Sequence, residues 1–175
     1  MPGVDPYAVR RALRTAAPSI ALFIAVILLV TPLRLFQGYV PTPWVPMIII
    51  FLYAVYEPEA LPPAVVFAAG LFHDLLYGAG IGVWATVYLG LQYMVYSQHE
   101  YLDGRLPRVV WMAFAVAAFI AALVLYLLRS FLAGGFLPMG PLFYQLFITV
   151  AVYRLATMIF FYLRARAARS EEHAS

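Results

Sequence analysis

The chain of 175 residues contains no cysteine and, although it has eleven basic residues, no lysine. Without cysteine there is no disulfide framework, no thiolate metal site and no cysteine nucleophile. Without lysine, the phosphate-binding P-loop, whose glycine-rich turn leads into Lys, cannot be completed. Charge is scarce in general, because Asp, Glu, Lys and Arg together make up 11% of the residues. These absences exclude cysteine-dependent chemistry and argue against phosphate binding at a glycine-rich turn.

Apolar residues dominate the composition. They make up 65% of the chain, and the mean hydropathy is +0.89, whereas soluble domains are about 45–50% apolar and about 25% charged. The polar residues are too few to coat even a small globule, so lipid is expected to solvate much of the surface. The composition therefore predicts an all-α integral membrane protein.

Six apolar runs are candidates for membrane spans. A bilayer core of about 30 Å requires about 20 helical residues, and the breaks between spans carry Pro, Gly or charge. The predicted spans are 18–33, 44–56, 61–77, 81–97, 109–128 and 141–163, of which the second is the shortest. The first run resembles a signal peptide, but no small-residue cleavage site follows it, so we interpret it as an uncleaved span. The expected organisation is a cytoplasmic segment (1–17), a six-span helical bundle (18–163) and a cytoplasmic tail (164–175).

The eleven Arg residues are distributed unevenly in this six-span arrangement. Eight lie on the side of the two termini, two on the opposite side, and Arg154 within the sixth span. Because basic loops remain in the cytoplasm, both termini of this multi-pass protein are predicted to be cytoplasmic. The Arg residues flank apolar runs and do not form a basic face with exposed aromatic residues, so no nucleic-acid partner is expected.

The most informative segment is the glycine-rich turn between the third and fourth predicted spans, which begins near Gly70 and contains Asp74. An ionised carboxylate about three residues inside a span is costly unless it is paired, hydrogen-bonded or hydrated, which makes Asp74 a functional candidate. The alternative is structural: Asp74 accepts hydrogen bonds from free N–H groups at the start of the fourth span.

The glycines of this turn fit either role. Gly78 and Gly82 are four residues apart, a spacing that allows close backbone approach, and Gly80 permits a turn with positive φ. Beside them, His73 points about 100° away from Asp74 around the helix, and we interpret it as an interfacial polar residue rather than a ligand. On the fourth span Tyr88, Gln92 and Tyr96 share one face, a possible polar lining that more commonly reflects packing.

Arg154 is the only Arg well inside a predicted span. Its estimated depth differs from that of Asp74 by about 6 Å, which a guanidinium side chain can cover, so an ion pair between the third and sixth spans is one hypothesis. The alternative is that Arg154 extends toward the cytoplasmic headgroups.

No catalytic pattern occurs in the sequence. There are no paired carboxylates within the spans, no Gly-x-Ser-x-Gly elbow and no His pair at metal-ligand spacing, since His73, His99 and His173 are far apart. We therefore expect a protein that is not an enzyme, with no catalytic residue, cofactor or metal.

One segment carries a family resemblance. It runs from Pro41-Thr-Pro-Trp44 through the Glu57-Pro58-Glu59 turn to Gly70-Leu-Phe-His-Asp74, Gly78 and Gly80-Ile-Gly82, and only hydropathy continues it after about Tyr96. In these residues the chain resembles the bacterial rod shape-determining protein MreD family. The resemblance implies a non-catalytic inner-membrane component of the cell-wall elongation complex, with a fold similar to the substrate-binding subunits of energy-coupling-factor transporters.

The resemblance also implies partners. They are membrane lipid, an MreC-like single-span protein, the elongation transpeptidase and glycosyltransferase, and, indirectly, MreB filaments. Two other classes remain open: a transport subunit that binds a small molecule near the outer face, and an accessory membrane protein without a ligand. A small-molecule binder should offer several convergent polar residues near the outer ends of the spans.

Overall fold

A computed structural model describes residues 6–30, 42–78 and 80–172, with side chains described for 15–30, 42–78 and 80–165. Within these ranges the regular structure is entirely helical. The α-helices are α1 (Pro6–Val30), α2 (Val45–Tyr56), α3 (Pro63–Tyr77), α4 (Val83–Tyr96), α5 (His99–Leu102), α6 (Pro107–Leu132) and α7 (Gly140–Glu172), and a 3₁₀ turn, η2 (Pro58–Ala60), precedes α3. The prediction of an all-α chain is confirmed for this part of the protein.

Each predicted span coincides over most of its length with one helix. Proline lies in the first turn of α2, α3 and α6, where its missing N–H removes no helical hydrogen bond. Two features were not predicted. The short α5 occupies the polar stretch before α6, and α7 continues without a break through the predicted tail to Glu172.

The core is formed mainly by buried side chains of α2, α4 and α6, with α1 and α3 packed against one side and α7 against another. Aromatic side chains join the helices. Phe51 of α2 packs edge-on against Phe114 of α6 at 5.1 Å between ring centroids, and Phe114 stacks on Tyr153 of α7 at 4.3 Å. Such aromatic pairs contribute about 0.5–1.5 kcal/mol each beyond the burial of their area. This cluster fixes α7 against the bundle at the middle of its length.

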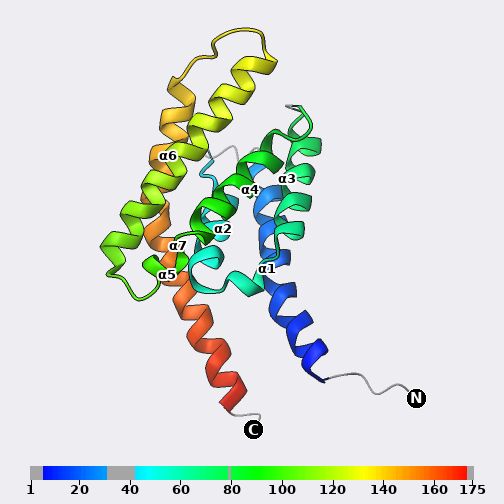
Figure 1. The fold of residues 1–175 in the computed structure, drawn as a ribbon, viewed down its shortest axis with the longest axis vertical. Coiled ribbons are helices and arrows are strands. Elements are labelled where there is room, and N and C mark those ends of the chain that lie inside the picture. The colour runs from blue at the N-terminus through cyan, green and yellow to red at the C-terminus, as the bar shows by residue number, and fades with distance from the viewer. Residues whose placement is uncertain (1–5, 31–41, 79, 173–175) are drawn as a thin grey trace, which may run out of the picture.

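The helices have two common ends (Figure 1). The terminal end contains the start of α1 and the finish of α7, together with α5 and η2. The turn end contains the α3–α4 turn and the α6–α7 loop. The start of the first helix and the finish of the last therefore lie at the same end of the bundle, as an even number of passes along it requires.

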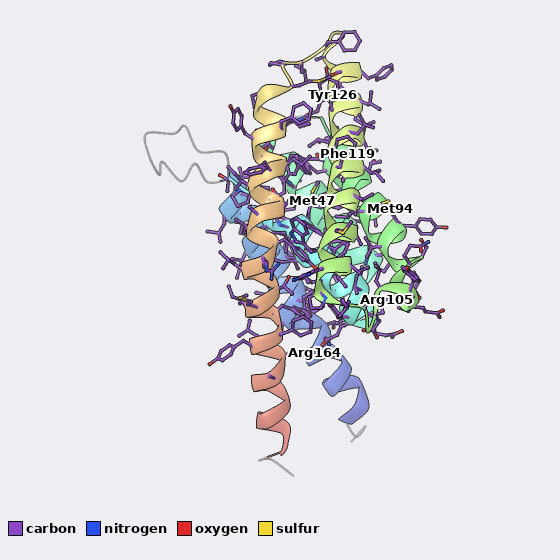
Figure 2. The ribbon with its side chains drawn as sticks, turned by 90° about the vertical axis from the view of Figure 1, so that its left-hand side faces the viewer. Met47, Met94, Arg105, Phe119, Tyr126 and Arg164 are labelled. Carbon is purple, nitrogen blue, oxygen red and sulfur yellow. The ribbon has the colours of Figure 1, made fainter. Side chains whose placement is uncertain are left out.

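Two helices among the described residues are long and apolar enough to cross a membrane: α6, and Gly140–Ala165 of α7. Within an apolar stretch of 18 residues in each helix, 44% of the stretch in α6 and 11% of that in α7 is buried inside the protein. Their outward faces carry large apolar side chains, and Figure 2 shows these projecting from both helices. The most exposed on the two helices are Phe131, Tyr144 and Phe147. Two such helices are consistent with membrane association.

The other apolar helices are shorter than the prediction required. Helices α2, α3 and α4 have 12, 15 and 14 residues. The part of α1 whose side chains are described, Thr15–Val30, has fewer than 18, although the whole helix has 25. At 1.5 Å per residue, 12–16 residues extend about 18–24 Å, less than the ~30 Å core of a bilayer. Only two helices among the described residues are long and apolar enough to span a membrane, so the structure does not support the prediction of six spans.

Candidate functional site

Asp74 lies near the end of α3 with its carboxylate directed at the start of α4. It is only 2% exposed. Its Oδ2 accepts hydrogen bonds from the backbone N–H groups of Gly82 (2.8 Å) and Ala85 (3.5 Å), and its Oδ1 accepts one from Trp84 (2.9 Å). The first N–H groups of a helix have no partner within it, and the helix dipole there favours a negative charge. Asp74 therefore caps α4 from the neighbouring helix, as the structural alternative predicted.

Three glycines shape the turn between the two helices. Gly78, Gly80 and Gly82 have φ values of 67°, 104° and 96°, a region that side-chain-bearing residues rarely adopt. The predicted positive φ of Gly80 is confirmed. Gly78 and Gly82 do not mediate close backbone approach, because an added Cβ at either would meet nothing within 4 Å. Their requirement is conformational, since Gly78 ends α3 and Gly82 stands immediately before α4.

The close approach occurs at Gly70 instead. A Cβ on Gly70 would lie 2.7 Å from the backbone nitrogen of Ala85 and closer still to its Cα. The backbones of α3 and α4 thus touch at this position, as at the small-residue contacts of membrane helices. Gly70 thus sets the distance between α3 and α4, and Asp74 connects the end of α3 to the start of α4.

His73 is fully buried, so its interpretation as an interfacial residue is wrong. Its ring stacks on Trp84 at 4.2 Å between centroids, and its Nδ1 shares a 2.8 Å hydrogen bond with the Tyr88 hydroxyl. The physical reason is that this face of α3 packs against α4. Of the face Tyr88–Gln92–Tyr96, the first two residues are buried and the third is exposed. The amide of Gln92 donates to the carbonyl of Leu61 at 2.7 Å.

Arg154 does not form the hypothesised ion pair with Asp74. The Trp111 Nε1 group, in the first turns of α6, donates to the carbonyl of Val150, which places that part of α7 level with the start of α6. Arg154, one turn further along, is exposed and borders a hollow together with Arg105 and Pro107 at the start of α6. Asp74 lies in the last turn of α3, which ends at the turn end. The depth comparison failed because a similar depth does not bring two helices together: α7 packs against α6 and α2, whereas α3 packs against α4 and α1.

A cavity of about 330 Å³ opens at the turn end next to His73. Its polar and aromatic lining residues are Thr42, Trp44, His73, Tyr77, Trp84, Tyr126, Arg129 and Gln145. The guanidinium of Arg129 lies 4.9 Å from the centre of the Tyr77 ring, within the range of a cation–π interaction. The volume of the cavity falls within the usual range for small-molecule sites, about 300–1,000 Å³.

Two polar atoms in the wall of this cavity have no hydrogen-bond partner among the described residues: Nε2 of His73 and Nε1 of Trp84. Leaving such a group buried and unpaired costs about 1–3 kcal/mol. Sequence reasoning found His73 but missed the participation of Trp84 and Gln145. The signal that could have located the cavity is Arg129, one of only two Arg residues assigned to the Arg-poor side.

Comparison of the chain with protein-family models, curated proteins and solved structures gives no match. The arguments about function therefore depend on the residues and their geometry.

Proposed function

We propose that this protein is a non-catalytic, multi-pass component of the cell-wall elongation (rod shape) complex in the bacterial inner membrane. The observation that carries the proposal is the α3–α4 hairpin. Five of the residues that underlie the MreD resemblance have a defined structural part in it: Gly70 sets the helix contact, Asp74 caps α4, and Gly78, Gly80 and Gly82 form the turn. The resemblance thus lies in residues that determine a particular helix pair.

A scaffolding role fits the rest of the molecule. The connections from α2 to α7 that the structure describes are short, and the outward faces of α6 and α7 are apolar. Such faces suit membrane lipid and the transmembrane helix of an MreC-like single-span partner, since helix association in a bilayer depends on packing rather than on hydrophobic burial. Through that partner the protein would act on the elongation transpeptidase and glycosyltransferase, and indirectly on MreB filaments.

The proposal includes six membrane passes with both termini in the cytoplasm. The helices too short to span alone, α2, α3 and α4, would lie within the bundle, where neighbouring helices and local bilayer thinning accommodate a short hydrophobic length. The Arg distribution supports this orientation, because the terminal end carries the majority of the basic residues. Similarity to energy-coupling-factor substrate-binding subunits is part of the same proposal.

Depletion of the protein in a rod-shaped bacterium tests the elongation role. The expected result is cells that round and widen while still growing on minimal medium. Affinity purification of the tagged protein from the undepleted bacterium should recover a single-span protein with a large periplasmic domain. A Gly70→Leu variant, in which α3 and α4 cannot touch, should fail to restore rod shape, whereas Gly90→Ala should restore it. Normal shape after depletion would contradict the proposal.

A second candidate function, a membrane subunit that binds a small molecule, is favoured by the cavity at the turn end. There Arg129, His73 and Trp84 bring a positive charge and two unpaired polar atoms together, the convergence of polar groups that such a site needs. Depletion would then produce a nutrient requirement with normal cell shape. Arg129→Gln would fail to relieve that requirement, and a variant of an Arg outside the cavity, Arg108→Gln, would relieve it.

A further inference from the structure

A second hollow, which we call the Arg crevice, lies at the terminal end between α2, the start of α6 and α7. It has a volume of about 660 Å³. Three Arg side chains border it, Arg105 from the α5–α6 loop and Arg154 and Arg164 from α7. Figure 2 shows Arg105 and Arg164 toward the same end of the molecule, opposite Tyr126. None of these residues belongs to the α3–α4 hairpin or to the cavity at the turn end.

The charges of the Arg crevice do not cancel. Arg164 Nε pairs with Glu57 at 3.0 Å, and Asp103 supplies one further carboxylate to the lining. Arg105 packs its guanidinium 4.3 Å from the centre of the Tyr101 ring and uses Nε to donate to the Tyr101 carbonyl. Arg154 has no ion-pair partner within the part of the chain whose side chains are described. Three guanidinium groups thus face two carboxylates, and among the residues whose side chains are described neither Arg105 nor Arg154 has an ion-pair partner.

Apart from Thr157 and the hydroxyl groups of Tyr56 and Tyr153, the rest of the Arg crevice is apolar. Val110 and Trp111 of α6 form one wall, and Met158 and Phe161 of α7 form the other. Next to these walls both helices expose further apolar side chains, Met112 and Val116 of α6 and Leu155 and Ile159 of α7, so the crevice borders a surface suited to acyl chains. A ligand that fits both parts has an anionic head and a long apolar body.

We infer that the Arg crevice binds an anionic phospholipid of the cytoplasmic leaflet, with its phosphate at Arg154 and Arg105 and an acyl chain between α6 and α7. Basic pockets between helices on the cytoplasmic side bind anionic headgroups, and Arg suits phosphate because its planar fork donates two parallel hydrogen bonds. A soluble phosphate compound would leave the apolar walls uncovered. The inference goes beyond the elongation role and rests only on the proposed residence and orientation in the membrane.

The test uses the full-length protein purified in a neutral detergent. Phosphatidylglycerol and phosphatidylcholine with identical acyl chains are added separately. The melting temperature is measured by intrinsic fluorescence, and bound lipid is measured by native mass spectrometry. Phosphatidylglycerol should raise the melting temperature and remain bound, and phosphatidylcholine should do so much less. Arg154→Gln should weaken phosphatidylglycerol binding about five- to tenfold, as expected for the loss of one charge-assisted contact.

Arg108→Gln is the matched control, because Arg108 is exposed on the first turn of α6 but does not border the crevice. It should bind phosphatidylglycerol as the unaltered protein does. Equal stabilisation by the two lipids, or an equal loss in Arg154→Gln and Arg108→Gln, would overturn the inference. A matching effect of glycerol 3-phosphate would also overturn it, since a soluble phosphate ligand would then suffice. Extraction of the protein without detergent would instead refute the membrane residence on which the inference rests.

Discussion

The backbone N–H of Trp84 donates a 2.9 Å hydrogen bond to the carboxylate of Asp74, so a side chain of α3 closes the open start of α4. No residue of α4 or its preceding turn provides a side-chain cap. The carboxylate is satisfied by backbone donors, so it requires no cation at this depth. Asp74 consequently has a positioning part in the hairpin.

Removal of this cap should destabilise the protein. Asp74→Ala leaves the N–H groups of Gly82 and Trp84 without their acceptor, at an expected cost of about 1–3 kcal/mol. Asp74→Asn keeps one acceptor oxygen but loses the charge, so its effect should be smaller. The melting temperature in detergent measures both. Glu100→Gln, at an exposed site, is the control, and equal effects of Asp74→Ala and Glu100→Gln would refute the capping role.

The helix contact at Gly70 predicts opposite results for two glycine substitutions in the same hairpin. Gly70→Ala places a methyl group against the backbone of Ala85 and should destabilise the protein by about 1–3 kcal/mol as the helices separate. Gly90→Ala, in α4 with nothing within 4 Å of the new Cβ, should be neutral or stabilising by up to about 1 kcal/mol. Similar melting temperatures for the two variants would show that α3 and α4 do not touch.

The turn glycines should respond to backbone preference rather than to side-chain size. Gly78→Ala and Gly82→Ala force an L residue into positive φ, which costs about 1–2 kcal/mol. Gly78→Asn should cost less, because Asn tolerates the left-handed region. Gly135→Ala is the control, since Gly135 has ordinary φ and open space around it. Unfolding in denaturant orders the four variants, and a greater loss for Asn than for Ala would contradict this account.

The separation of Asp74 from Arg154 predicts independence. Asp74→Asn should lower stability, Arg154→Gln should change it by no more than about 0.5 kcal/mol, and the double variant should equal their sum within about 0.5 kcal/mol. The double-mutant cycle is measured in detergent without added lipid, so that the Arg crevice does not enter. A coupling energy above 1 kcal/mol would restore the ion pair between α3 and α7.

The sequence was sufficient to locate the helices because Pro, Gly and charge separate the apolar runs. It was also sufficient to identify Asp74 and the alternative that it caps α4, since a lone buried carboxylate beside a helix start has few other partners. Helix lengths were harder. Hydropathy does not distinguish a run that ends with its helix, such as α2, from one whose helix continues into polar sequence, as α7 does beyond Leu163.

The errors concern contacts between helices. His73 was assigned to an interface because its angle relative to Asp74 was known but not which face of α3 meets α4. Arg154 was compared with Asp74 by depth alone, but α7 packs against α6 and α2, whereas α3 packs against α4 and α1. The cavity beside Arg129 combines residues of several helices, so local sequence patterns alone could not assemble it.

The contact at Gly70 restricts how a movement at one end of the α3–α4 hairpin can reach the other end. Because the backbones of α3 and α4 touch there, any sliding of one helix along the other would carry a larger residue into the space that only Gly70 fits. The shear motions by which packed helices commonly respond to a partner are therefore blocked in this pair. A partner that binds at one end of the hairpin can move the other end only by tilting both helices together as one rigid body.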